Sequence, residues 1–194
     1  AVTGLCFIGF ITSHLVGNMT IYGGFNSFNN YAEKLHSLGS LISLAEWILL
    51  ALALVHVTTG VFLFFQNIAA RPDRYEKNKR AGGRTISSST MPYTGLIILI
   101  FVVFHLIDFH FVDKTNTTIF EIVLNTFQNP VYALGYIMAM VVLAVHIRHG
   151  FWSAFQTLGA NHPKYMPLVM GASILFSIIV GIGFGFIPIY LSPS

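Results

Sequence analysis

The sequence predicts an all-α integral membrane protein in which five transmembrane helices form a single domain over residues 1–194. Of these residues, 55% are hydrophobic and only 9% are charged, and the mean hydropathy is +0.72. A soluble domain of this length is less apolar and more highly charged. The net charge of +3 is therefore no sign of nucleic-acid binding, and what matters is where the charges lie along the chain.

Five apolar runs are long enough to cross a bilayer, which takes about 20 residues in an α-helix. A membrane β-barrel would instead show short segments of alternating polarity. The first run contains the single cysteine, Cys6, so an intrachain disulfide is excluded and we expect Cys6 to be a small buried hydrophobe. The chain begins inside this run without a methionine; we expect upstream residues to be missing and do not interpret the start as a cleaved signal peptide. The runs cover residues 1–17, 41–65, 91–112, 131–155 and 168–190.

Basic residues in the connections predict the orientation in the membrane. Lys164 follows the fourth run, whereas the connections expected outside hold only Lys34 and Lys114. By the positive-inside rule the basic connections face the cytoplasm, which places the N-terminus inside and the C-terminus outside. The main basic cluster lies between the second and third runs and consists of Arg71, Arg74, Lys77, Lys79, Arg80 and Arg84.

Two further segments have a residue pattern that predicts their structure or packing. Residues 25–38 carry apolar side chains at helical spacing, which predicts a short helix lying on the outer surface. The fifth run is rich in glycine, and Gly181 and Gly185 have the small-xxx-small spacing that lets membrane helices pack closely.

Four of the five runs carry a histidine deep within the run, and an ionisable residue at such a depth indicates a functional site. His56 and His146 each lie about ten residues, or roughly 15 Å, from the inner end of their run. His14 and His105 lie in the outer half of theirs. The four histidines thus form an inner pair and an outer pair from opposite helices. This arrangement is the one required to hold two haems stacked across the membrane.

A haem with two axial imidazoles has no open position for oxygen and is suited to electron transfer. His110 and His149 are rival ligands, because each lies about one helical turn from His105 or His146. Arg148 and His149 lie nearer the cytoplasmic boundary, and we assign them to contacts with haem propionates or a quinone. The alternative for Arg148 is an extension to the lipid head groups. His36 and His162, in connections, are not expected to be ligands.

Four segments carry a family resemblance, which extends over nearly the whole chain. They resemble the cytochrome b subunit of succinate:quinone oxidoreductases in its single-subunit, five-helix, two-haem form. The most specific segment is the last, with its His-x-Arg-His-Gly pattern and Trp-Ser continuation. The segments are residues 1–18 with His14-Leu-Val-Gly17-Asn18, Phe104-His105-Leu106, Gln128-Asn129-Pro130, and His146-Ile-Arg148-His149-Gly150 continuing to Gly159.

The resemblance implies a multi-pass anchor in the bacterial inner (plasma) membrane, with a flavoprotein subunit and an iron–sulfur subunit on its cytoplasmic face. Electrons from succinate would reach the inner haem, then the outer haem and a quinone, commonly menaquinone; fumarate reduction would run the other way. The complex could form homo-oligomers. This chain has no dinucleotide-binding pattern and no set of cysteines for clusters, so the dicarboxylate chemistry is expected in its partners.

Candidate quinone residues are less sharply defined. Arg84 and the segment 87–91, which includes Ser89, are similar to a Ser/Arg-Thr-Met segment of the family, but the basic residue of that segment is missing here. The alternative is a helix N-cap at Ser89 or Thr90 ahead of Pro92. Glu46, near the outer end of its run, is either part of a proton path to a quinone or an interfacial carboxylate. Asp108 has the same two interpretations.

Two other functions stay open at this point. A di-haem cytochrome b anchor of a hydrogenase or formate dehydrogenase would have the same absorbance but a different soluble partner. A haem-free transporter with a histidine proton relay would show broken helices in inverted repeats, and the sequence indicates neither.

Overall fold

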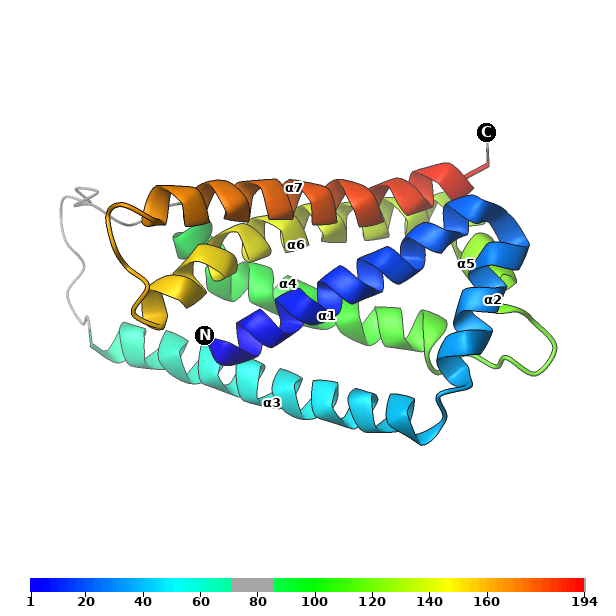
Figure 1. Cartoon of the computed structure of the whole chain (residues 1–194), viewed down its shortest axis with the longest axis horizontal. Helices are drawn as coiled ribbons and strands as arrows, with labels where there is room; N and C mark the ends of the chain where they lie inside the picture. Colours follow the sequence, from blue (N-terminus) through cyan, green and yellow to red (C-terminus); the bar gives the residue numbers. More distant parts are fainter. Residues whose placement is uncertain (71–85, 194) are drawn as a thin grey trace.

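The computed structural model describes residues 1–70 and 86–193 of the chain, with side chains at 1–70 and 90–193. This part of the chain consists of helices and their connections, without strands (Figure 1). The elements are α1 (Val2–Asn18), the 3-10 helix η1 (Met19–Gly23), α2 (Gly24–His36), α3 (Ser40–Ala69), α4 (Ile86–Phe109), α5 (Ile119–Gln128), α6 (Pro130–Thr157) and α7 (Met166–Leu191).

The five long helices α1, α3, α4, α6 and α7 correspond to the five predicted runs. Each of the five belongs to a helical stretch that is long and apolar enough to cross a membrane. The connection of α6 to α7 lies at the same end of the bundle as the end of α3 and the start of α4, while α2, α5 and the C-terminus lie at the opposite end (Figure 1). The predicted basic connections therefore share one end, although Arg71 to Arg84 themselves lie outside the described residues. Which end faces the cytoplasm stays a prediction.

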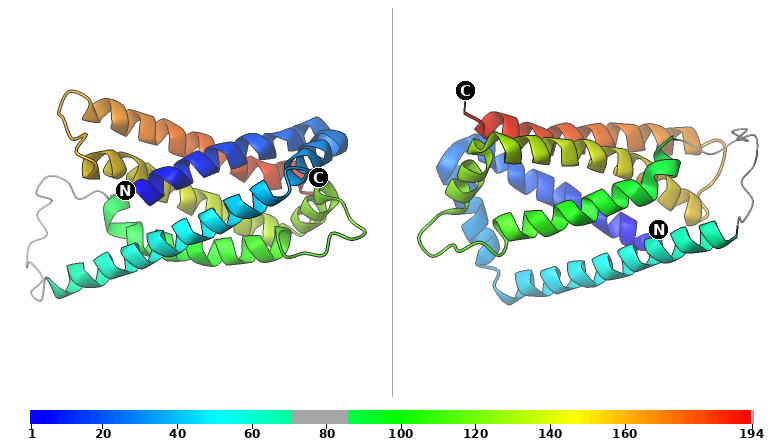
Figure 2. Two further views of the ribbon diagram at one scale, coloured as in Figure 1. Left: turned by 60° about the horizontal axis from the view of Figure 1, so that its bottom comes forward. Right: turned by 180° about the vertical axis from the view of Figure 1, so that it is seen from behind.

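Gly181, one of the two predicted small positions, lies close to α6, whereas a Cβ atom at the other, Gly185, would make an ordinary contact of 3.7 Å with Met140. A Cβ atom at Gly181 would lie 3.0 Å from the Cβ of Ala144 on α6, and one at Gly183 would lie 2.9 Å from Leu15 on α1. Because an added methyl group has no free space there, these glycines fix the approach of the helices. In both views of Figure 2, α6 and α7 run side by side and α1 crosses the bundle.

The end of the bundle that carries α2 and α5 is closed by short helices. The predicted surface helix at 25–38 is confirmed as α2. The sequence interpretation missed α5, although Thr118 and Glu121 form a capping box at its start. The backbone N–H and the hydroxyl of Thr118 donate to the Glu121 carboxylate and lower its pKa. The side-chain oxygen of Asn29 accepts a bond from the Phe120 N–H at 3.1 Å, which ties α2 to α5.

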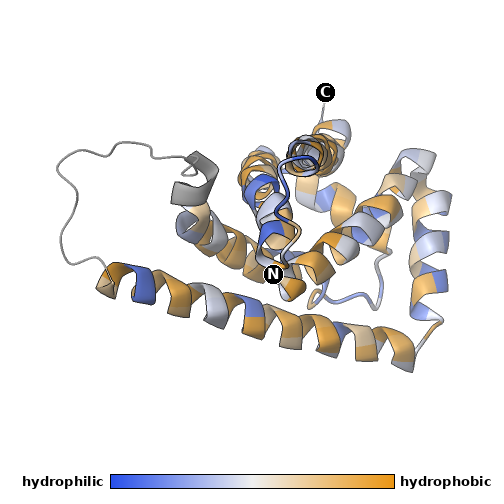
Figure 3. Ribbon diagram, turned by 60° about the vertical axis from the view of Figure 1, so that its left-hand side comes forward, coloured by the Kyte–Doolittle hydropathy of each residue, from blue (hydrophilic) through white to orange (hydrophobic). Residues whose placement is uncertain are grey.

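Helix α3 is set apart from the other spanning helices (Figures 1 and 2). None of its residues is buried, and large side chains such as Trp47 and Leu54 are exposed by 69% and 60%. Figure 3 shows hydrophobic residues along the whole helix. Gly39, with a φ of 55°, makes the turn that leads from α2 into it. A helix with so much exposed apolar surface is expected to lie against the hydrocarbon core of a lipid bilayer.

Two expectations from the sequence are wrong. Cys6 is exposed and not buried, because it points away from the neighbouring helices on α1. Ser89 and Thr90 do not cap α4, because the helix begins at Ile86 and Pro92 lies inside it. A proline is tolerated within a membrane helix when neighbouring groups take up the freed backbone carbonyls.

Candidate functional site

The outer histidines meet between α1 and α4. The ring centres of His14 and His105 are 5.9 Å apart, and the rings lie edge to face. The predicted outer pair is thus brought together.

Aromatic rings surround the outer pair. Phe10 stacks on His14 with ring centres 5.3 Å apart, and Phe184 of α7 lies 5.6 Å from the same ring. Phe101 and Phe109 lie 5.7 and 5.2 Å from His105, one turn to either side of it on α4. Such surroundings exclude water and offer flat apolar surfaces to a flat apolar ligand.

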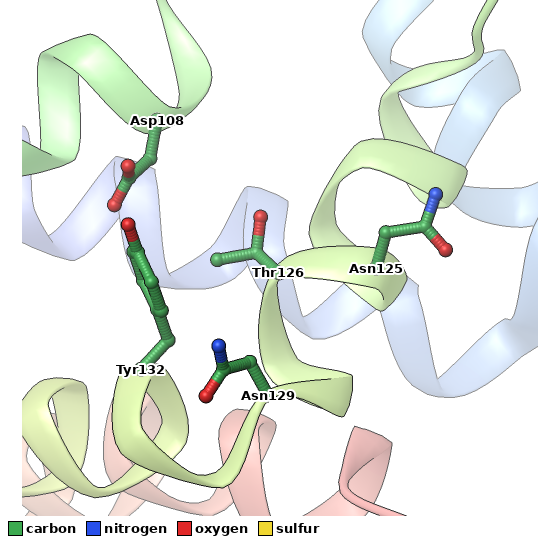
Figure 4. Close-up of a pocket in the computed structure, with 5 residues that line it drawn as sticks. All are labelled: Asp108, Asn125, Thr126, Asn129 and Tyr132. Atoms are coloured by element: carbon green, nitrogen blue, oxygen red, sulfur yellow. The ribbon is translucent and has the colours of Figure 1, made fainter.

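Tyr136 and Asp108 form a hydrogen-bonded pair near His105, toward the end of the bundle that carries α5. The ring of Tyr136 lies 6.2 Å from His105, and its hydroxyl donates to the Asp108 carboxylate at 2.7 Å. Asp108 in turn lines a cavity of about 210 Å³ at this end. Figure 4 shows Asp108 and Tyr132 pointing toward one another beside three further polar residues, Asn125, Thr126 and Asn129. Asp108 thus lies beside other polar groups, and both of its interpretations stay open.

The inner histidines lie near one another, with His146 close enough to His56 for their charges to interact. Each ring is held by a threonine of a neighbouring helix. The Nδ1 atom of His56 lies 3.1 Å from the Thr3 hydroxyl on α1. The Nδ1 atom of His146 lies 3.0 Å from the Thr94 hydroxyl on α4. The predicted inner pair is therefore brought together as well.

A glycine follows each of these threonines and also faces the histidine. A Cβ atom at Gly4 would lie 3.8 Å from Cε1 of His56, and one at Gly95 would lie 3.5 Å from Cε1 of His146. The two inner half-sites are therefore alike, each built from a Thr-Gly pair beside an imidazole.

The sequence of α1 and α4 repeats this arrangement. Thr3 precedes His14 by eleven positions, and Thr94 precedes His105 by eleven positions. Eleven residues make about three helical turns and a rise of roughly 16 Å, so both groups lie on one helix face. Helices α1 and α4 thus each carry a Thr-Gly pair at the inner level and a histidine at the outer level. This spacing fixes the separation of the two pairs.

The geometry separates the rival ligands. His110 lies away from the outer pair, half exposed, with its Nδ1 atom 3.7 Å from the Glu46 carboxylate. His149 packs edge to face on Trp152, with ring centres 5.0 Å apart. His105 and His146 are the members of their rival pairs that face a partner histidine.

The remaining predicted site residues are placed as follows. Arg148 is exposed, and Glu46 is exposed beside His110. His36 and His162 lie on the surface, as expected. Arg84 lies outside the described residues, and only the backbone of Ser89 is described. The structure therefore gives no geometry for these two quinone candidates.

Two orphaned nitrogen atoms test whether the residues fit a haem. The buried Nδ1 atoms of His105 and His149 have no hydrogen-bond partner within the described parts of the chain. A buried polar atom without a hydrogen-bond partner is rare, and a ligand from outside the protein can supply that partner. A haem would supply a propionate as a partner for Nδ1 of His149, and its iron would bind the paired imidazoles through their other ring nitrogen. The residues present thus fit the group.

No known protein family, curated protein or solved structure matches this chain.

Proposed function

We propose that this protein is the di-haem cytochrome b anchor subunit of a succinate:quinone oxidoreductase, passing electrons between an iron–sulfur subunit and a membrane quinone. The observation that carries the proposal is the pairing of four intramembrane histidines at two levels. The ring centres of His14 and His105 are 5.9 Å apart, and His146 lies near His56. Unbroken spanning helices around the pairs support an electron carrier over a transporter, which typically has discontinuous helices at its binding site.

The chain would hold one haem at each level. His56 and His146 are the ligands of the inner haem, and His14 and His105 are those of the outer haem. A haem bound by two imidazoles supplies one-electron transfer and offers no position for oxygen. The aromatic residues around the outer pair would shield it from water. His149, whose buried Nδ1 has no partner among the described residues, and the exposed Arg148 would contact propionates or a quinone.

Protons for a quinone at the outer level would enter from the end of the bundle near α5. The Tyr136–Asp108 hydrogen bond joins the cavity at that end to the ring beside His105. Glu46 with His110 forms a second titratable pair at the same end, in contact with solvent. Both pairs lie at this end of the bundle, and ionisable residues at a membrane boundary are typical of proton paths.

The proposal assigns the succinate and fumarate chemistry to a flavoprotein subunit and an iron–sulfur subunit on the cytoplasmic face of a bacterial inner membrane. Menaquinone is the proposed quinone. The basic connections at one end of the bundle support this orientation through the positive-inside rule.

Purification in mild detergent under native conditions tests the identity of the partner. We expect the protein to copurify with a flavin-containing subunit and an iron–sulfur subunit, and we expect succinate to reduce its haem in a reduced-minus-oxidised spectrum. Malonate, which competes with succinate for carboxylate-binding groups, should block this reduction. Reduction by hydrogen or formate, with no response to succinate, would instead assign the chain to the anchor of a different dehydrogenase.

A further inference from the structure

We infer that Thr3 and Thr94 are positioning residues for the inner haem, holding the two inner histidines by Nδ1 so that Nε2 serves as the ligand atom. This inference rests on the proposed function, since it concerns the same histidine pair. The hydrogen bonds that carry it, 3.1 Å for Thr3 and 3.0 Å for Thr94, join helices that are far apart in the sequence.

The proton of the Thr94 hydroxyl decides the direction of the bond to His146. The same hydroxyl lies 3.1 Å from the backbone carbonyls of Thr90 and Met91 and donates to one of them. A hydroxyl has a single proton to donate, so its oxygen acts toward His146 as an acceptor. His146 therefore carries its proton on Nδ1, and the lone pair on Nε2 is free to bind a metal.

The inner and outer levels differ in this respect. At the inner level both Nδ1 atoms have a hydroxyl partner. At the outer level the buried Nδ1 of His105 has none within the described parts of the chain, and His14 and His105 are held by aromatic rings. The same eleven-residue spacing on α1 and α4 thus produces one hydrogen-bonded pair and one pair packed in an apolar shell.

A hydrogen bond from Nδ1–H to an acceptor fixes the orientation of the ring and makes its other nitrogen more basic. A more basic ligand stabilises ferric over ferrous iron and so lowers the midpoint potential. Loss of such a partner commonly costs 10- to 100-fold in metal affinity. The effect is expected at the inner haem alone, because neither threonine contacts the outer pair.

Electron paramagnetic resonance and redox titration of the purified complex test the inference, with Thr94→Val and Thr3→Val as the variants. The inner haem is identified as the signal that His146→Ala removes. In both variants we expect a higher midpoint potential and a shifted low-spin signal for the inner haem; a tenfold loss of ferric preference would correspond to about 59 mV. Thr94→Ser, which keeps the hydroxyl, should restore the wild-type values.

The matched control is Thr58→Val on α3, two positions after His56. The Thr58 hydroxyl is exposed and bonds to the carbonyls of its own helix, at 2.6 Å for Leu54, so both haem signals should stay unchanged. An unaltered inner haem in both Thr94→Val and Thr3→Val would overturn the inference while leaving the proposed function intact. Equal disturbance of both haems would also overturn it. A wild-type protein without haem would overturn the proposed function itself.

Discussion

Replacing His146 with alanine is expected to remove the inner haem and to leave the outer haem in place. His146 faces His56 on α3, and the two would bind the same iron from opposite sides. Without one imidazole the iron keeps a single strong protein ligand, and the hydrogen bond from His146 to Thr94 is lost as well. His56→Ala should have the same effect, because it removes the other ligand of the same iron.

The measurement is haem content per chain together with the low-spin resonance signals of the purified variants. We expect each variant to retain about half of the wild-type haem. His162→Ala is the control, since His162 lies in the connection between α6 and α7, where it accepts a bond from the Lys164 N–H. If either inner variant inserts normally and loses both haems equally, the assignment of His56 and His146 to one iron is wrong.

Replacing His105 with alanine is expected to remove the outer haem, whereas His110→Ala should retain both haems. The two histidines are five positions apart on or just after α4, yet only His105 faces His14. His110 points to Glu46, and both of these side chains are about half exposed. Loss of His110 therefore removes only a half-exposed contact with Glu46, and such surface contacts contribute little to stability.

The His105→Ala and His110→Ala variants are compared by haem content and by their low-spin resonance signals. The signal of the inner haem serves as the internal reference. His14→Ala should match His105→Ala, because the two residues are assigned to one iron. Loss of the outer signal in His110→Ala, with its retention in His105→Ala, would show that His110 is the ligand. In that case the end of α4 near Phe109 adopts a different conformation when haem is bound.

Hydropathy and helical rise were sufficient to predict most of the framework. Apolar runs long enough to cross a bilayer are a strong signal, and all five appear as helices. The depth of a residue in such a run follows from its position and the rise per residue. His14 could therefore be matched with His105, and His56 with His146, before their contacts were known.

Hydropathy alone did not predict the short helix α5 or the correct start of α4, because both depend on short-range signals in the sequence. Helix α5 is only 10 residues long and lies beside a polar connection, so it does not resemble a spanning run. Its capping box at Thr118 and Glu121 was the available signal. The start of α4 was placed too late because Pro92 was read as the first turn of a helix, whereas it lies inside one.

The threonine contacts could not be predicted from the sequence. A threonine in a membrane helix usually bonds to a carbonyl of its own helix, as Thr12 and Thr58 do here. Thr94 also bonds to a carbonyl of its own helix, but Thr94 and Thr3 additionally reach a histidine of another helix, and this depends on packing between distant segments. The repeated Thr-Gly spacing to His14 and His105 is visible in the sequence, but its meaning depends on the position of His56 and His146.

The haem-to-protein ratio of the purified wild-type chain, measured with its reduced-minus-oxidised spectrum, tests the central claim most directly. The histidine pairing predicts two b-type haems per chain, both low-spin with two imidazole ligands. A ratio of one would contradict the assignment of a haem to each level. The absence of haem would contradict the proposed function and would leave the paired intramembrane histidines to proton transfer or transport.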